Sequence, residues 1–274
     1  MKYLCEIRYL GTHFCGFQVQ PSRRTVQGVL TEAASKVFGC PVAVTGASRT
    51  DSGVHAAGFA LTLEPKDGAL RIPPDNLPLA LREHLPPDLS LSSARIVADG
   101  FHPRYDARWK EYRYTVYASR VADPFLYGRV WHMPIPFLPD AVERMNAAAA
   151  HLVGTHDFSA FRSEGSPTRS PIRTVFGCTV ERDGALYTIS IRGDGFLYNM
   201  VRIVAGTLVS VAVGQIEPDR VGEILSSRKR PSAGPTAPPE GLTLWHVHYD
   251  EADFLKETRE EKEIISENSS NIAE

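Results

Sequence analysis

The sequence has few cysteines, and their arrangement excludes two classes of protein. The four cysteines, Cys5, Cys15, Cys40 and Cys178, form no CxxC pair and have no histidine partner at zinc-ligand spacing. This pattern is typical of reduced thiols in a cytosolic core, and not of a disulfide-stabilised secreted domain or a zinc ribbon. The opening segment MKYLCEIRYL is too short and too polar for a signal peptide, so we expect a cytoplasmic protein.

Long apolar runs and cofactor motifs are also scarce. The most apolar stretch, Phe196 to Val213, is interrupted by Asn199 and Arg202, which favours a buried helix with one polar stripe over a membrane span. The histidines are scattered, and no HExxH, P-loop or GxGxxG spacing occurs. The sequence therefore predicts no membrane segment, no metal and no nucleotide cofactor.

Excess charge of either sign is small, with a formal net charge of −2 over 274 residues. The last segment, residues 257–274, carries six glutamates against Arg259 and Lys262, and without it the net charge is +2. Basic residues cluster in the remaining chain at three places: Arg104, Arg108, Lys110 and Arg113; Arg162, Arg169 and Arg173; and Arg228, Lys229 and Arg230. These local patches are compatible with phosphate binding, although many proteins without nucleic-acid partners have similar ones.

The apolar periodicity predicts two α+β halves, residues 1–104 and 105–256, and an acidic tail over 257–274 that we expect to be frayed or disordered. In the first half we expect a strand over 2–10, a helix over about 25–38, strands on both sides of residues 49–55, a short helix ending near 84, and a strand over 89–97. In the second we expect a strand from about 108, a helix over 140–152, a hairpin of strands 175–182 and 186–192, helices over 196–213 and 218–226, and a last strand over 244–249.

Residues 46–58, GASRTDSGVHAAG, combine a carboxylate and a guanidinium in a short polar segment between two strand-like runs. Asp51 lies two residues from Arg49, and three glycines permit tight turns. A loop between strands is a common place for reactive side chains. The alternative is a surface turn with a solvated ion pair, and these residues alone do not decide between the two interpretations.

The segment from Ser48 to Ala56, SRTDSGVHA, resembles the catalytic signature GRTDAGVHA of the TruA-type tRNA pseudouridine synthases. Ser48 and Ser52 replace two other small residues of that signature. Five further segments are similar to this family and follow its order: YLGTHFCGFQ from Tyr9, KEYRY from Lys110, HDFSAFR from His156, the helix from Phe196 to Gly206, and EGL from Glu240. Leu10 and Phe17 stand where the family has aspartate and tryptophan. The resemblance covers about residues 1–250.

The resemblance implies that Asp51 is the catalytic carboxylate and that Tyr112, Arg202, Phe196 and Leu242 line its pocket. An aspartate can attack as a nucleophile, stabilise positive charge on the sugar, or accept a proton, and the sequence leaves these roles open. We expect Arg49 to hold the carboxylate charged or to bind a flanking phosphate.

The pocket residues also have structural interpretations that remain open. Tyr112 is a core tyrosine if it does not pack on a flipped uracil, and Phe196 and Leu242 are core residues if they are not pocket walls. Arg202, alone in an apolar helix, needs an anionic partner because an unpaired buried charge is costly. The resemblance makes that partner Asp51; the alternative is a salt bridge elsewhere in the core.

The implied function is isomerisation of uridine to pseudouridine in the anticodon stem-loop of tRNA, at tRNA positions 38, 39 and 40. The implied fold is α+β: two similar halves, each a mostly antiparallel sheet with helices on one face, and a cleft between them that contains Asp51. The implied quaternary state is a homodimer that cradles the tRNA. Two alternatives remain: a non-catalytic RNA-binding or RNA-folding protein, and a carboxylate-based glycoside hydrolase. The second requires another acid near the first, and the loop around Asp51 has none.

Overall fold

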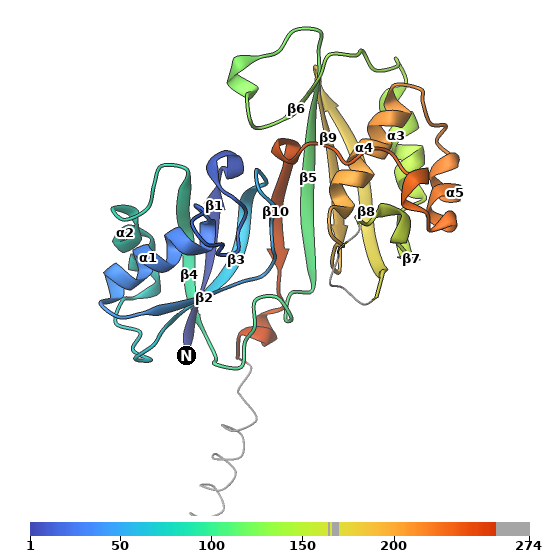
Figure 1. The fold of residues 1–274 in the computed structure, drawn as a ribbon. Helices are drawn as coiled ribbons and strands as arrows, with labels where there is room; N and C mark the ends of the chain where they lie inside the picture. The colour runs from blue at the N-terminus through green and yellow to red at the C-terminus, as the bar shows by residue number, and fades with distance from the viewer. Residues whose placement is uncertain (164, 166–169, 256–274) are drawn as a thin grey trace, which may run out of the picture.

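A computed structural model of the chain describes residues 1–163, 165 and 170–255. The acidic tail predicted over 257–274 lies outside these residues. Within them, one large, mostly antiparallel sheet has helices on one face (Figure 1). This arrangement confirms the predicted α+β class.

The sheet has its last strand in sequence at its centre. Among the described residues the strand order is β4-β1-β3-β10-β5-β9-β8-β7, with β2 paired to β3 and β6 paired to β5. The strands are β1 Lys2–Tyr9, β2 Val42–Gly46, β3 His55–Pro65, β4 Leu89–Val97, β5 Trp109–Ala118, β6 Trp131–Met133, β7 Gly154–Asp157, β8 Ile172–Asp183, β9 Leu186–Gly193 and β10 Leu242–His248. β10 is parallel to β3 and antiparallel to β5, so it joins the sheets expected for the two halves into one.

Two groups of helices pack on the sheet. α1 Val26–Phe38 and α2 Leu77–Arg82 cover the strands formed by the first part of the chain, whereas α3 Ala141–Ala150, α4 Met200–Ala212 and α5 Arg220–Ser227 cover those of the second (Figure 1). α1 has clear end signals in the sequence: the Thr25 side chain accepts a hydrogen bond from the Gly28 amide, and Gly39 ends the helix in the left-handed conformation.

α4 begins four residues later than predicted. Asn199 precedes it with a φ of 59°, a left-handed conformation that an α-helix does not continue through. Phe196 therefore lies in the loop before the helix and not on it. Every residue of α4 is buried except Arg202, which is also the only charged residue of this helix. No helix in the described part of the chain is long and apolar enough to cross a bilayer.

The loop between α5 and β10 lies directly against α4. The Ala237 amide donates to the Arg202 carbonyl, and the Gly234 amide donates to the Thr207 hydroxyl. The backbone approaches Gly206 so closely that a β-carbon there would overlap the Pro235 carbonyl oxygen. These contacts bring the short 3-10 turn Pro239–Gly241, and β10 after it, to the centre of the sheet.

Candidate active site

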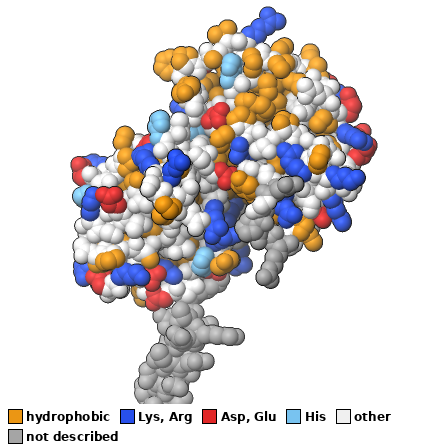
Figure 2. Space-filling view, viewed as in Figure 1, with side chains coloured by type: hydrophobic (Ala, Val, Ile, Leu, Met, Phe, Trp, Pro, Cys, Tyr) orange, Lys and Arg blue, Asp and Glu red, His pale blue; other side chains and the backbone are white. Residues whose placement is uncertain are grey.

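A cavity of about 970 Å³ lies between the two groups of elements. Its walls come from seven parts of the chain: residues 15–23, 48–54, 104–112, Gly165, Arg173, 194–202 and Leu242. Lys and Arg side chains gather in the hollow between the two lobes of the molecule (Figure 2). The six residues predicted for the site all line this one cavity: Arg49, Asp51, Tyr112, Phe196, Arg202 and Leu242.

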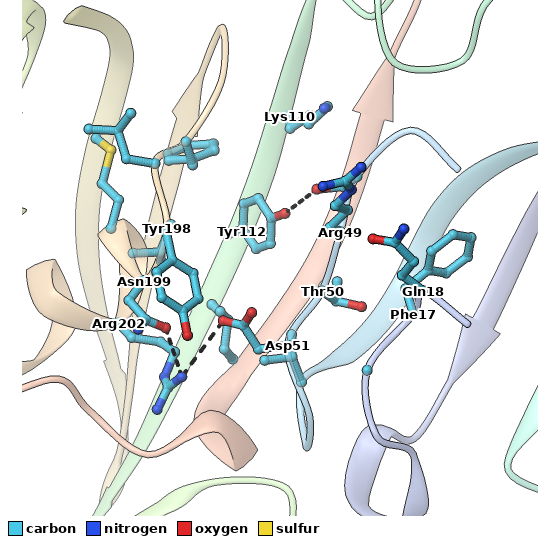
Figure 3. A pocket seen from close by; sticks show the side chains of 18 of the residues that line it. Phe17, Gln18, Arg49, Thr50, Asp51, Lys110, Tyr112, Tyr198, Asn199 and Arg202 are labelled. Atoms are coloured by element: carbon cyan, nitrogen blue, oxygen red, sulfur yellow. Dashed lines mark hydrogen bonds and ion pairs between the residues drawn. The ribbon is translucent and has the colours of Figure 1, made fainter. Parts of the chain in front are cut away.

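The loop between β2 and β3 is anchored through Thr50, the residue before Asp51. Thr50 is buried, and its hydroxyl lies 2.7 Å from the Tyr9 hydroxyl. Its carbonyl accepts a hydrogen bond from the Phe17 amide at 3.1 Å. After Asp51 the chain turns sharply at Gly53, which has a φ of 82°. The neighbours of Asp51 are thereby fixed to the core, which leaves the carboxylate directed into the cavity (Figure 3).

His55, the first residue of β3, connects this loop to the rest of the site. Its Nδ1 accepts a hydrogen bond from the Gly11 amide at 2.9 Å, and its Nε2 lies 3.0 Å from the Glu240 carbonyl oxygen. An amide donor on Nδ1 and a carbonyl acceptor at Nε2 require a neutral ring with its proton on Nε2. Burial lowers the pKa of His55, which favours the same neutral form.

Asp51 faces Arg202 across the cavity. Arg202 Nη1 lies 3.7 Å from Asp51 Oδ2, and the two side chains are 16% and 36% exposed (Figure 3). Burial raises the pKa of Asp51, and the positive charge of Arg202 acts in the opposite direction. The ion pair therefore offsets part of the cost of keeping a partly buried carboxylate ionised.

Arg202 is itself held in place by two other groups. Its Nε donates to the Ala237 carbonyl at 2.7 Å, and its Nη1 donates to Asn199 Oδ1 at 2.9 Å. Asn199 in turn donates to the Ser163 hydroxyl at 3.0 Å. Asn199 and Arg202, expected to form one polar stripe, thus do contact one another, although Asn199 lies just before α4 and not on it.

Arg49 is placed differently from the expectation that it holds the Asp51 carboxylate charged. Arg49 is exposed, and its guanidinium points away from Asp51 (Figure 3). Within the described ranges, the ion pair of Asp51 is with Arg202, and none joins it to Arg49. The expectation that Arg49 holds the carboxylate charged is wrong, because Arg49 is exposed to solvent while Arg202 supplies the positive charge next to Asp51.

Tyr112 and Phe196 form one wall beside Asp51. The Tyr112 hydroxyl lies 3.0 Å from the Ser48 hydroxyl, and the two rings meet edge to face with centroids 5.1 Å apart. Burial raises the pKa of Tyr112 to about 12, so its hydroxyl is neutral at physiological pH. Tyr112 is on the buried face of β5, and Phe196 is in the loop before α4. Leu242, the first residue of β10, is buried and completes the lining.

Lys110 is a site residue that the sequence reasoning did not select. Its side chain is only 8% exposed, lines the cavity, and donates from Nζ to the Ala47 carbonyl at 2.6 Å. Because Lys110 and Tyr112 are two residues apart on β5, both point to the same face, and both contact the base of the Asp51 loop. The alternation of Lys110, Tyr112 and Tyr114 is the signal in the sequence that places this lysine inward. No group of three or more histidine, cysteine or acidic side chains in the described chain is placed to hold a metal ion.

Comparison with known proteins assigns a family to this architecture. A family model described as tRNA pseudouridine synthase matches residues 7–106 and 148–250. The tRNA pseudouridine synthase A of Thermoanaerobacter sp. (strain X514) is 43% identical over 243 residues, which are 89% of this chain and 97% of that protein. The tRNA pseudouridine synthase A of Bacillus subtilis (strain 168) is 41% identical over 252 residues, which are 91% of this chain and 100% of that protein.

A structural comparison gives a much weaker similarity. A chain in the crystal structure of a Cbf5-Nop10-Gar1 complex superimposes with a TM-score of 0.38 and 11% identity, covering 92% of this chain and 52% of that one. A superposition at this level carries no weight for the fold or the function.

Proposed function

The chain belongs to the tRNA pseudouridine synthase family, and from this premise we propose which uridines it modifies and which residues act. The enzyme isomerises uridine to pseudouridine in tRNA. We propose that its targets lie in the anticodon stem-loop and that Asp51 is the catalytic carboxylate. The observation that supports the catalytic assignment is the position of Asp51: inside a large basic cavity, paired with Arg202 and next to the Tyr112 ring. The anticodon stem-loop target rests on the resemblance to the TruA-type synthases.

The reaction breaks the N1–C1′ bond of the uridine, turns the base over, and joins C5 to C1′; the proton on C5 leaves and N1 is protonated. A carboxylate can assist by attacking as a nucleophile, by stabilising positive charge on the sugar, or by taking the C5 proton. All three roles require the ionised form of the carboxylate, since a group that takes a proton must itself be deprotonated. Arg202 supports this form, because its charge opposes the rise in the pKa of Asp51 that burial causes.

The target base must leave its stack before it reaches Asp51. In the cavity, Tyr112 and Phe196 replace the lost stacking and Leu242 supplies an apolar wall. An aromatic contact of this kind contributes about 1–3 kcal/mol per base. We propose that Arg49, at the mouth of the cavity, contacts a backbone phosphate and not Asp51.

We also propose that the active chain is a cytoplasmic homodimer in which residues 1–104 and 105–256 act as two halves. The two separate matches of the family model support this division. The free cysteines and the tRNA substrate fit a reducing compartment. Light scattering of the purified chain tests the dimer, since a monomeric mass at working concentration contradicts it.

The test of the catalytic assignment compares Asp51→Ala and Asp51→Asn with the wild-type chain on an unmodified tRNA transcript. Pseudouridine formation is expected to be abolished in both variants, whereas the tRNA still binds. Mapping of pseudouridine along the transcript then tests the anticodon stem-loop. Turnover by either variant disproves the role of Asp51, and wild-type modification confined to another part of the tRNA disproves the proposed target. Binding is expected to weaken steeply with salt because phosphate contacts dominate affinity.

A further inference from the structure

Besides Arg23, three cations that the proposed chemistry does not use line the same cavity. Arg104 comes from the loop after β4, Lys110 from β5 and Arg173 from β8. Figure 3 shows Lys110 on the opposite side of Tyr112 from the Asp51–Arg202 pair, so Lys110 lies beyond the proposed catalytic pair along β5. Figure 2 shows basic side chains gathered in the same hollow.

Lys110 is the most buried member of this group. Its ammonium donates to the Ala47 carbonyl, and among the described residues no carboxylate lies within ion-pair distance of it. An ammonium has three donors, so the Ala47 carbonyl leaves donor capacity unused. Burial lowers the pKa of Lys110 to about 8, and the nearby charge of Arg104 acts in the same direction. A buried cation without a counterion is costly in free energy, and a bound anion removes that cost.

Arg104 and Arg173 lack an acidic partner in the same way. In the described parts of the chain neither forms an ion pair, and the guanidinium of Arg173 donates only to the backbone carbonyls of Ser170 and Ile172. Burial is the main cause that lowers the pKa of Arg173; the charge of Asp194 opposes it, and the charge of Arg104 has a smaller lowering effect, so Arg104 is near Arg173. Gly195 packs beside Arg173: a β-carbon there would lie 3.5 Å from Arg173 Nε, an ordinary van der Waals contact.

One acid, Asp194, also lines this part of the cavity and must be weighed against the three cations. Its charge raises the pKa of Arg173, opposing the effect of burial. However, Asp194 Oδ1 accepts a hydrogen bond from the Thr174 amide at 3.0 Å, which already uses part of its capacity. One carboxylate against three cations leaves a net positive charge in a partly enclosed space.

We propose that Arg104, Lys110 and Arg173 form an anion subsite that binds a backbone phosphate of the RNA strand beside the target uridine. The inference rests on the proposed function, because it assumes that RNA fills the cavity. Guanidinium groups present planar pairs of donors that match phosphate oxygens, and the buried ammonium adds a compact charge. Since Lys110 lies two residues along β5 from Tyr112, a phosphate held there fixes the nucleotide next to the base that packs on Tyr112.

The first experiment measures RNA binding by the full chain with Arg104→Gln, Arg173→Gln and the double variant at several salt concentrations. Each lost phosphate contact is expected to reduce the slope of log affinity against log salt by about 0.7–0.9. Lysine at either position is expected to restore most of the slope, because the charge is kept. Arg82→Gln is the matched control: Arg82 is 72% exposed on α2, pairs with Glu83, and does not line the cavity.

The second experiment identifies the phosphate. Each phosphate near the target uridine is replaced in turn by a neutral methylphosphonate, and binding to the wild-type chain and to the double variant is compared. At one position the modification is expected to weaken wild-type binding several-fold and to leave binding by the double variant unchanged, the non-additivity expected of direct partners. Effects that are additive at every position, or variants with the wild-type salt slope, overturn the subsite.

Both readouts are binding measurements, so the subsite and the catalytic assignment fail separately. If the variants show the expected change in slope but the wild-type chain forms no pseudouridine, the subsite is supported and the proposed function is disproved. If the wild-type chain forms pseudouridine but the variants have the wild-type salt slope, the proposed function is supported and the subsite is disproved.

Discussion

Replacement of Arg202 by glutamine tests whether the ion pair sets the ionisation of Asp51. The charged atoms are 3.7 Å apart. With an effective dielectric constant of about 20, Coulomb's law gives an attraction of about 4 kcal/mol near this separation. Because the Asp51 side chain is 36% exposed, solvent screening reduces the effective attraction to about 1–2 kcal/mol. This difference corresponds to about one pKa unit.

The direction of the expected change follows from the two influences on Asp51. Burial already raises its pKa, and Arg202 lowers it. Without the guanidinium, the pKa of Asp51 rises further, so the carboxylate is protonated at a higher pH than in the wild-type chain. If the ionised form is the active one, the acidic limb of the pH–rate profile for Arg202→Gln moves to higher pH by about one unit.

The assay is single-turnover pseudouridine formation on a tRNA transcript between about pH 4 and pH 8, which spans the range from a normal to a strongly raised aspartate pKa. Arg202→Lys is the matched control, because it keeps the positive charge and loses the planar donors. Its acidic limb is expected to stay within about half a unit of wild type, even if its maximal rate is lower. Thermal unfolding and tRNA binding verify that each variant is folded.

The reasoning is refuted if Arg202→Gln keeps the wild-type limb while its maximal rate falls. That result would mean that Arg202 acts through position or through contact with the RNA, and that its charge does not set the ionisation of Asp51.

Three further changes have expected outcomes. Asp51→Asn is expected to be inactive yet at least as stable as wild type, because burial raises the pKa of Asp51 in the folded chain and so makes its ionisation unfavourable to folding. Urea unfolding is expected to show this difference at pH 7 and to lose it as the pH falls below the unfolded-state pKa of about 4. Tyr112→Ala is expected to lose far more turnover than Tyr112→Phe, because only the former loses the ring, worth about 1–3 kcal/mol per stacked base; equal losses would assign the effect to the hydroxyl. Gly206→Ala is expected to destabilise the fold by about 1–3 kcal/mol, since its β-carbon would overlap a backbone carbonyl. Gly177→Ala is the control: it has open space around it and is expected to change stability by less than about 0.5 kcal/mol. Equal unfolding midpoints for the two variants would contradict the packing of the loop against α4.

Those features of the site that depend on local pattern were predictable from the sequence. Alternating apolar residues placed strands on both sides of the Asp51 loop, and β2 and β3 lie there. The contact between Asn199 and Arg202 was predicted from helical spacing and is present, although Asn199 itself precedes α4. That a buried arginine requires an acid was expected from its charge, whereas the choice of Asp51 as that acid came from the family resemblance.

The features that were not predicted depend on the tertiary structure. The sequence does not reveal that β10 lies between β3 and β5, because strand order depends on long-range pairing. The direction of Arg49 depends on bends in an irregular loop, for which residue spacing is a poor guide. The four-residue error at the start of α4 arises from Asn199: the apolar pattern extends through it, but its left-handed backbone ends the helix.

The position of β10 explains why both halves are needed to form the cavity. Asp51 lies just before β3, Tyr112 lies on β5, and β10 pairs with both strands. Two inter-strand steps place β3 and β5 about 10 Å apart, because neighbouring strands are about 4.8 Å apart. Asp51 and Tyr112 therefore line the same cavity from strands that are separated by the width of β10. The hydrogen bond from His55 to the Glu240 carbonyl fixes the entry of β10 against the start of β3, so it sets the separation between the carboxylate and the ring that must hold the base.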